Sequence, residues 1–364
     1  MIVFWICIGL LVQVYILYPW TLRFKKSRKS FNPENHGSDN VVSIIIAAHN
    51  EENIIEEKIK NTLALNYAKM EILIGDDGST DKTAEIVAKY SEVRLIKKEK
   101  NEGKAAMLND LCKAAKGEIL LFSDANTMIE STALENMLAM FADEKVGCVC
   151  GRLALRDESG TALGKTESVY WKGESKLKKL ESNFGAVMGS NGALYAIRAK
   201  LYSELPTHKT VMDDFYITAK ILLKNYYCVF CENALAFENT SASKYGEFKR
   251  KVRIGRANFN FLFVFLPLLN PLHPMRAYMF LSHKLLRWLS PFLLLAVFIC
   301  SILLMQDHIF YKAFLAVELL FVLAALFGVR VCSYFLSMNF ALFLGFCKSF
   351  FREKGGAWER VERN

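Results

Sequence analysis

Apolar residues gather at the two ends of the chain, and a mixed pattern fills the middle. Residues 1–20 form an almost unbroken apolar run, which is long enough to cross the hydrocarbon layer of a membrane. Basic residues follow this run, whereas a cleaved signal peptide carries its positive charges before the apolar segment. We therefore predict a transmembrane helix over residues 1–22 and a basic linker over residues 23–40. Because basic residues favour the cytoplasmic side, the segment that follows should be cytosolic.

The middle of the chain, residues 41–258, has the pattern of an α/β domain. Short apolar runs rich in Val, Ile and Leu predict strands buried on both faces, at residues 41–48, 70–75, 93–96 and 119–123. Amphipathic stretches that predict helices lie between them, at residues 51–65, 81–90 and 104–115. Strands and helices that alternate in this way predict a mostly parallel sheet with helices on both faces.

The last third of the chain returns to apolar character. We predict interfacial amphipathic helices over residues 259–290, where charged and aromatic residues recur among apolar ones. Transmembrane helices are predicted within residues 291–350, and the clearest spans are 291–305 and 309–327.

The segment 331–347 has two interpretations. It either crosses the membrane or forms a re-entrant or interfacial segment. We favour the second, because a crossing would place the basic tail, residues 351–364, outside the cytosol, against the preference of basic residues for the cytoplasmic side. The tail is therefore predicted to be cytosolic.

The composition agrees with this division. The chain has 364 residues, of which 52% are hydrophobic and 23% charged, which excludes a disordered or collagen-like protein. The net charge is +9, and much of it lies in the linker, at residues 249–256 and in the tail. All three segments should face the cytosol. We therefore expect contacts with membrane lipids and phosphate groups, and no nucleic-acid partner.

Polar residues collect where three of the predicted strands end. The three segments are His49-Asn50-Glu51-Glu52, Asp76-Asp77-Gly78-Ser79-Thr80-Asp81 and Ser123-Asp124-Ala125-Asn126. The carboxyl ends of parallel strands lie at one edge of the sheet, and sheets of this kind bind ligands there. Each segment alone could be a turn that leads into a helix. Three of them on one edge favour a binding site rich in carboxylates and amides.

Seven segments, in order, resemble the motif set of family 2 glycosyltransferases, in particular the membrane-embedded branch with poly-N-acetylglucosamine, hyaluronan and cellulose synthases. They are Ala47-Ala48-His49-Asn50-Glu51-Glu52, Asp76-Asp77-Gly78-Ser79-Thr80-Asp81, Asn101-Glu102-Gly103-Lys104, Asp124-Ala125-Asn126-Thr127, Gly189-Ser190-Asn191-Gly192, Asp213-Asp214 and Arg250-Lys251-Val252-Arg253. The resemblance implies a GT-A type α/β domain that binds a nucleotide sugar, flanked by transmembrane helices. It also implies an enzyme of the hexosyltransferase class, integral to the cytoplasmic membrane with its catalytic domain in the cytosol.

The resemblance assigns a set of residues to the nucleotide-sugar donor. This set is Ala48, Asn50, Glu51, Asp76, Asp77, Lys104, Asp124 and Arg250. Among them, Asp76 or Asp77 would accept the N–H of a uracil. Mg²⁺ or Mn²⁺, which prefer oxygen ligands, would offset the charge of the leaving diphosphate. The expected metal ligands are Asp124 and Asn126. Because Asn126 stands where the family has a second Asp and carries no charge, we expect a lower metal affinity.

Sugar transfer also needs a base that takes the proton of the attacking hydroxyl group. By resemblance Asp213 and Asp214 occupy the family's Glu-Asp pair, and Asp214 is the expected base. Adjacent carboxylates can raise one another's pKa, and both residues can also stabilise the start of the following helix. A single displacement would invert the donor's anomeric carbon and give a β-linkage. Arg253 matches an arginine expected beside the diphosphate.

The polymerising relatives carry Gln-x-x-Arg-Trp where this chain has Arg250 and Ile254 at the first and last positions. The missing Trp weakens the expectation of processive polymerisation. The leading prediction is an inverting transferase that moves a sugar from a UDP-linked donor to a glycan or lipid-linked acceptor in surface polysaccharide synthesis, alongside polysaccharide assembly partners. The alternatives are a processive synthase that also secretes its polymer, a transferase to polyprenyl phosphate, and a catalytically inactive assembly scaffold. A dinucleotide-binding oxidoreductase is disfavoured because no G-x-G-x-x-G follows the first strand.

Overall fold

The computed structural model describes residues 1–24, 39–156, 162–239 and 244–351. The chain divides into two compact units, and the boundary in its second half lies between Lys244 and Tyr245. The middle of the chain forms one unit, and the helices of residues 1–24 together with residues 245–351 form the other. The boundary precedes the predicted residue 258, because the basic helix that begins at Lys244 clusters with the apolar ends of the chain.

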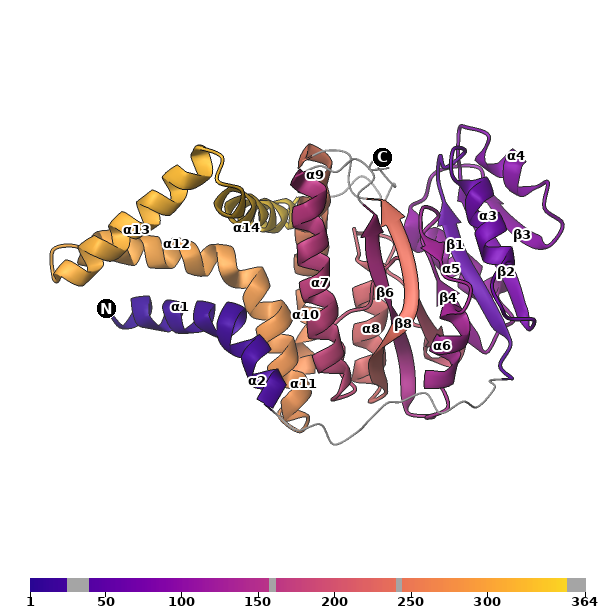
Figure 1. Ribbon diagram of the computed structural model, residues 1–364, viewed down its shortest axis with the longest axis horizontal. Coiled ribbons are helices and arrows are strands. Elements are labelled where there is room, and N and C mark those ends of the chain that lie inside the picture. The colour runs from indigo at the N-terminus through magenta and orange to yellow at the C-terminus, as the bar shows by residue number, and fades with distance from the viewer. Residues whose placement is uncertain (25–38, 157–161, 240–243, 352–364) are drawn as a thin grey trace. The chain divides into compact units, whose positions relative to one another are not determined.

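The middle unit is built on one eight-stranded sheet with the order β3-β2-β1-β4-β7-β6-β8-β5 (Figure 1). The strands are β1 (Val42–Ala48), β2 (Met70–Asp77), β3 (Val93–Lys98), β4 (Ile119–Phe122), β5 (Met128–Ile129), β6 (Val146–Arg156), β7 (Tyr195–Arg198) and β8 (Tyr227–Asn239). The half β3-β2-β1-β4 is parallel throughout, as the sequence predicted. The other half is mixed, because β7 runs antiparallel to β4 and β6, and β5 runs antiparallel to β8.

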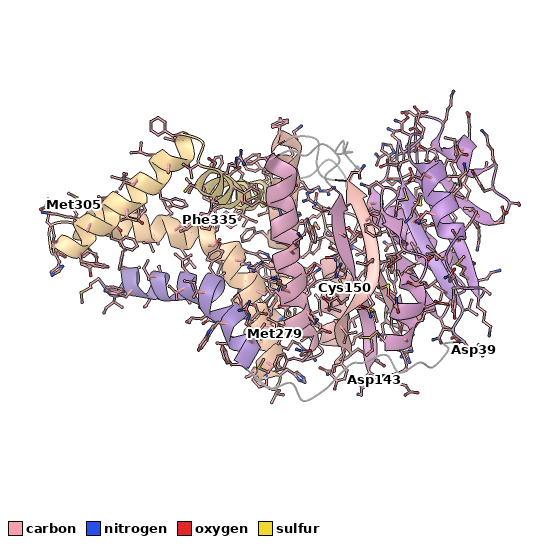
Figure 2. The ribbon with its side chains drawn as sticks, viewed as in Figure 1. Asp39, Asp143, Cys150, Met279, Met305 and Phe335 are labelled. Atoms are coloured by element: carbon pink, nitrogen blue, oxygen red, sulfur yellow. The ribbon has the colours of Figure 1, made fainter. Side chains whose placement is uncertain are left out.

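Helices connect these strands. They are α3 (Ile55–Leu63), α4 (Thr83–Val87), α5 (Lys104–Ala114), α6 (Ala133–Met140), α7 (Ala162–Ser182) and α8 (Asp213–Leu223). The first three fall within the helical segments that the sequence predicted. Gly75 of β2 allows α5 to pack closely on the sheet, because a Cβ atom there would lie 2.2 Å from Sδ of Met107. Aliphatic side chains of β1, β2 and β4 fill the core, and Cys150 of β6 is also buried (Figure 2).

The parallel strands end together at the edge where the polar motifs lie. In the register of β1 with β2, Ala48 pairs with Asp76, the penultimate residue of β2. β4 pairs with the other side of β1 and ends at Phe122, directly before Ser123. The loops after the three strands therefore leave the sheet from one edge, as the alternation of strands and helices predicted.

The unit formed by the chain ends is helical. Its elements are α1 (Ile2–Val12), a π-helical segment (Gln13–Leu17), α2 (Tyr18–Phe24), α9 (Lys244–Asn260), α10 (Leu262–Phe265), a 3₁₀ segment (Leu266–Leu269), α11 (Pro274–Met279), a second π-helical segment (Phe280–Leu285), α12 (Leu286–Leu304), α13 (Ile309–Leu326) and α14 (Arg330–Ser349). Among the described residues, four helices are long and apolar enough to cross a membrane: Ile2–Phe24, Pro274–Leu304, Ile309–Leu326 and Arg330–Ser349. The segments Tyr245–Asn260 and Leu262–Leu269 meet at a 64° bend.

The second candidate span is longer than the sequence suggested. The last part of the expected interfacial segment 259–290 and most of the expected span at 291–305 belong to one continuous helix, Pro274–Leu304. Pro291 lies inside it and cannot donate a hydrogen bond to the carbonyl of Arg287. The Ser290 hydroxyl lies 2.8 Å from that carbonyl and 2.7 Å from Oδ1 of Asn339, and the helix continues through the proline.

Candidate active site

Asp76 and Asp77 end β2 side by side, but their oxygens have different partners. The Asp77 carboxylate accepts the backbone N–H groups of Glu102 and Gly103, at 3.0 and 2.7 Å, and so holds the turn before α5. The Asp76 Oδ1 atom accepts the N–H of Ser79 at 3.3 Å. Its Oδ2 atom is buried and has no partner in the described part of the chain. Because a buried carboxylate oxygen normally accepts a hydrogen bond, Asp76 is the better candidate for contact with a ligand N–H.

The loop after β1 packs against the same turn. The Asn50 backbone has a φ of 56°, a left-handed conformation that asparagine tolerates, and its Oδ1 accepts the N–H of Thr80 at 2.8 Å. The His49 Nδ1 atom lies 2.9 Å from the carbonyl of Asp77, and its Nε2 lies 3.1 Å from the amide nitrogen of Asn101. These partners are satisfied by a neutral imidazole with its proton on Nδ1. Asn50 and Asp77, which were predicted to bind the nucleotide sugar, thus form hydrogen bonds that hold the loops in place.

The other two residues predicted on this loop have backbone or packing contacts. Glu51 donates its backbone N–H to the Thr83 hydroxyl at 2.8 Å, which ties the loop to α4. Ala48 is fully buried within the core.

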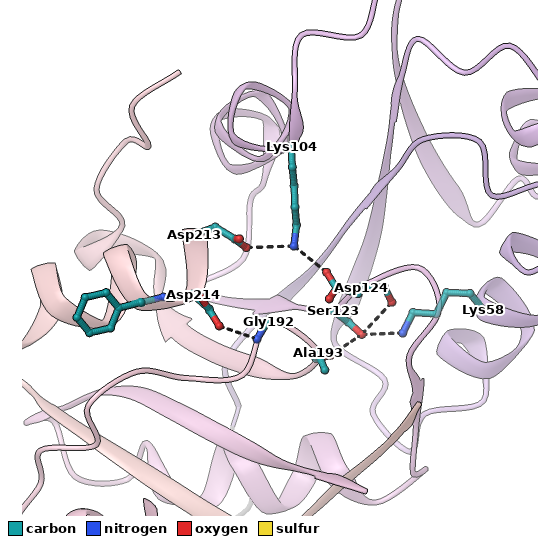
Figure 3. Close-up of polar contacts among 9 residues, drawn as sticks. Lys58, Lys104, Ser123, Asp124, Gly192, Ala193, Asp213 and Asp214 are labelled. Atoms are coloured by element: carbon teal, nitrogen blue, oxygen red, sulfur yellow. Dashed lines mark hydrogen bonds and ion pairs between the residues drawn. The ribbon is translucent and has the colours of Figure 1, made fainter. Parts of the chain in front are cut away.

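Lys104, Asp124 and Asp213 meet at the carboxyl edge of the sheet (Figure 3). The Lys104 Nζ atom lies 2.7 Å from Asp124 Oδ1 and 3.2 Å from Asp213 Oδ2. Burial lowers the pKa of Lys104, but the charges of Asp124 and Asp213 outweigh it and raise that pKa above its ordinary value. The ammonium group therefore stays charged and links the loop after β4 to the start of α8.

Asp214 lies in the first turn of α8, next to this ion pair. Its Oδ2 accepts the backbone N–H of Gly192 at 3.1 Å, and its Oδ1 accepts that of Phe215 at 2.7 Å. Removal from water and the charge of Asp213 raise the pKa of Asp214 to about 6, although the Phe215 N–H, Lys178 and Lys104 act in the opposite direction. This carboxylate is ionised at neutral pH and is a stronger base than an ordinary aspartate.

Asp124 and Asp214 face a common space beside Gly192. A Cβ atom at Gly192 would lie 3.6 Å from Asp124 Oδ2 and 3.9 Å from Asp214 Oδ2. Only the hydrogen atom of a glycine side chain occupies this position, so the two carboxylates are left open toward it. The structure thus brings together four predicted residues from three segments, the start of α5, the loop after β4 and the start of α8: Lys104, Asp124, Asp213 and Asp214.

The side-chain oxygens of Asp124 and Asn126 suit a divalent cation that is also coordinated by oxygens of the substrate. No group of three or more His, Cys, Asp or Glu side chains that could hold a metal occurs among the described residues. Asp124 Oδ1 is bound to Lys104, which leaves Oδ2. Among the described residues, none forms a hydrogen bond with the half-buried Asn126 amide. One or two protein oxygens are enough where phosphate oxygens complete the coordination, as is usual for Mg²⁺.

The predicted residues Arg250 and Arg253 lie on α9, in the unit formed by the chain ends. The Arg250 Nε and Nη2 atoms donate to the two carboxylate oxygens of Glu247, at 2.7 and 3.1 Å. Arg253 is exposed. The structure therefore gives Arg250 a partner within its own helix, and the assignment of both arginines to the donor stays a prediction.

The sequence did not indicate a role for two buried lysines that lie beside the group of Lys104, Asp124, Asp213 and Asp214. Lys58 of α3 is fully buried, and burial lowers its pKa to about 7 in spite of the nearby charges of Asp124 and Glu238. Lys178 of α7 donates to Asn191 Oδ1 and lies 3.8 Å from Cys150 Sγ. A signal for Lys58 existed, since it lies among Ile55, Ile59 and Thr62 on the buried face of an amphipathic helix.

Residues 43–204 match the sequence profile of Glycosyl transferase family 2. These residues form a family 2 glycosyltransferase domain. The resemblance found in the motifs is thereby confirmed, and the domain contains every predicted donor residue except Arg250.

Relatives of this glycosyltransferase include poly-beta-1,6-N-acetyl-D-glucosamine synthases of staphylococci. The protein of Staphylococcus aureus strain MSSA476 is 28% identical over 261 residues, which are 70% of this chain and 61% of the relative. That of Staphylococcus epidermidis is 28% identical over 219 residues, or 58% of this chain and 53% of the relative. The match thus spans less than two thirds of the length of these relatives.

Among solved structures, this chain is similar to a mannosyltransferase of Pyrobaculum calidifontis, determined in complex with GDP-Man and Mn²⁺. The TM-score is 0.72 at 22% sequence identity, and the match covers 96% of this chain and 99% of the other. The similarity shows that the glycosyltransferase has a GT-A type α/β fold accompanied by apolar helices, as the sequence predicted.

Proposed function

We propose that this glycosyltransferase moves a sugar from a nucleotide-diphosphate donor to a glycan or lipid-linked acceptor at the cytoplasmic membrane, with inversion to a β-linkage. The observation that carries the proposal is the group of Lys104, Asp124, Asp213 and Asp214 at the carboxyl edge of the sheet, in which Lys104 and Asp124 belong to the residues that match family 2. Its two open carboxylates, Asp124 and Asp214, face one space beside Gly192, and each has a different role in the transfer.

The nucleoside half of the donor would bind between the loops after β1 and β2. Asp76 offers one carboxylate oxygen there, because its second oxygen already accepts the N–H of Ser79. Uracil presents one N–H between two carbonyl groups and needs one acceptor. Guanine presents two adjacent donor groups and needs two. The unpartnered Oδ2 of Asp76 would accept the uracil N–H of a UDP-linked donor.

The diphosphate half of the donor would lie beside Asp124. Asp124 and Asn126 would hold Mg²⁺ or Mn²⁺ together with the diphosphate oxygens, and the cation would supply positive charge against the leaving group. Lys104 is charged and adjacent to Asp124, so it adds a second cation near the same phosphates. Positive charge that is fixed in advance stabilises the further negative charge that the diphosphate gains as its bond to the sugar breaks.

The acceptor hydroxyl would be activated by Asp214. As its oxygen attacks the anomeric carbon, the bond to the diphosphate breaks on the opposite side, and the proton passes to the Asp214 carboxylate. The Gly192 N–H fixes Oδ2, while the start of α8 fixes Oδ1 through the Phe215 N–H. The pKa of about 6 suits a base that works near neutral pH.

The membrane would present the acceptor to a cytosolic domain. This placement rests on the four candidate spans and on the basic residues that follow the first of them. Surface polysaccharide synthesis is supported by the staphylococcal relatives, whose names describe a polysaccharide synthase. Those names also favour a second candidate function, processive synthesis of a polymer.

One experiment separates these functions. Membranes that contain the protein are incubated with labelled UDP-sugars and GDP-sugars, each with Mg²⁺ or Mn²⁺, and the products are sized and extracted. A single added sugar supports the proposal, and a polymer ladder supports the second candidate. An organic-soluble, acid-labile product would identify a polyprenyl phosphate acceptor. Absence of transfer and hydrolysis with every donor would refute enzymatic function and leave an inactive scaffold.

A further inference from the structure

Lys58 is a buried lysine without an acidic partner. Its side chain is completely buried in α3, and no Asp or Glu oxygen within the described ranges lies at salt-bridge distance from its nitrogen. Lysine is seldom buried in this way unless its ammonium group has fixed partners. Here the partners are the hydroxyl of Ser123, at 2.8 Å, and the carbonyl of Thr127, at 2.5 Å.

These two partners are the first and last residues of the loop after β4, which carries Asp124 and Asn126. The Lys58 nitrogen therefore joins the two ends of this loop, with one hydrogen bond to each end. A methionine would fill the same volume but could donate neither hydrogen bond. The volume of the core alone thus does not explain a lysine at this position.

The Ser123 hydroxyl extends the contact to a second loop (Figure 3). It accepts from Lys58 and donates to the carbonyl of Ala193 at 3.0 Å. Ala193 follows Gly192, whose N–H holds Asp214 at 3.1 Å. One buried hydroxyl group thereby connects the loop that carries Asp124 with the loop that holds Asp214.

We propose that Lys58 and Ser123 are positioning residues that fix Asp124 and Asp214 relative to one another. The inference rests on the proposed function, in which Asp124 belongs to the donor diphosphate and Asp214 to the acceptor hydroxyl. Neither Lys58 nor Ser123 touches a reacting atom. They affect the rate of transfer because the attack requires the acceptor hydroxyl to be aligned with the anomeric carbon of the donor. Residues that hold the ligand-binding side chains in place maintain this alignment.

The test compares Lys58→Met, Ser123→Ala and the double variant with Lys60→Met, a change at an exposed lysine of the same helix. Steady-state transfer is measured with the donor identified for the wild type. We expect each single variant to lower kcat by about 10- to 100-fold, the range for partners behind ligating side chains, with less than about a threefold change in donor KM. The double variant should resemble the single variants, since both remove the same link. Lys60→Met should retain the wild-type kcat.

Hydrogen exchange gives a readout that does not need activity. In the folded protein, Lys58→Met should accelerate amide exchange in residues 123–127 and in residues 189–194, while Ser123→Ala should do so chiefly in 189–194. If Lys58→Met does not fold, Ser123→Ala alone still decides the question.

A kcat equal to that of Lys60→Met, an effect on KM alone, additive effects, or unchanged exchange in 189–194 would overturn the proposal. Absence of transfer by the wild type refutes the proposed function, and in that case the exchange data still decide whether the link exists.

Discussion

At the scale of single residues, adjacent side chains of the same type have different roles because their partners differ. Asp77 is occupied by two backbone N–H groups of the turn before α5, whereas Asp76 keeps one buried oxygen without a described partner. The sequence assigned both aspartates to the nucleoside without distinguishing them. Hydrogen bonds across loops make the distinction, and no spacing of residues along the chain contains it.

We expect Asp76→Asn to weaken the binding of UDP by roughly 10- to 100-fold, because a hydrogen bond to a charged group contributes about 1.5–3 kcal/mol. Titration calorimetry with UDP measures the change. The matched control is Asp77→Asn, which should lower the melting temperature by disturbing the turn at Glu102 and Gly103. Equal UDP affinity in wild type and Asp76→Asn would exclude Asp76 from the nucleoside pocket.

The pKa of Asp214 leads to a second prediction at this scale. The base must be ionised, so kcat should rise with pH through about 6 and then level off. Asp213→Asn removes a like charge that raises this pKa, so the rise should move to lower pH. A pH profile of kcat for the two proteins checks both statements. A rise that stays in place, or moves to higher pH, would show that Asp213 does not tune the base.

At the scale of elements, α9 and α14 approach one another closely at two glycines. A Cβ atom at Gly345 of α14 would lie 2.7 Å from the Arg256 nitrogen and the Val252 oxygen of α9. Gly255 of α9 faces the same crossing, where a Cβ atom would lie 3.2 Å from Cα of Leu342. Small residues allow helix backbones to approach in this way, which favours helix association in membranes.

Gly345→Val should therefore destabilise the helical unit by about 1–3 kcal/mol, the usual cost of overpacking. The expected result is a lower melting temperature of the detergent-solubilised protein. Gly9→Val is the matched control in the same unit, because no atom lies within 4 Å of a Cβ built at Gly9. Equal melting temperatures for the two variants would argue against a tight crossing of α9 and α14.

The sequence predicted elements where local pattern determines them. The apolar runs located β1 to β4, and the amphipathic stretches located α3 to α5. The mixed half of the sheet was not predicted, because β7 pairs with β4 and β6 across long separations that leave no local period. Lys58 lies on the buried face of α3, but its contacts, like those of Lys178, are with distant loops that the sequence does not show.

At the scale of the whole molecule, the chain combines a family 2 glycosyltransferase domain with helices suited to a membrane. The high apolar content belongs to the chain ends, and the site carboxylates belong to the middle. This division was predictable because composition changes sharply along the sequence. The length of the second span was not predicted, because the charged and aromatic residues before residue 291 indicated an interfacial segment, whereas Pro274–Leu304 is one helix.

The most direct measurement compares wild-type protein with Asp214→Asn in membranes, using the accepted labelled donor and Mg²⁺ or Mn²⁺. Asparagine keeps an oxygen for the Gly192 N–H but is not a base. We predict donor binding within about threefold of wild type and transfer lowered by roughly 10²- to 10⁴-fold, the usual contribution of a general base. Transfer at the wild-type rate would contradict the assignment of Asp214 and the mechanism built on it.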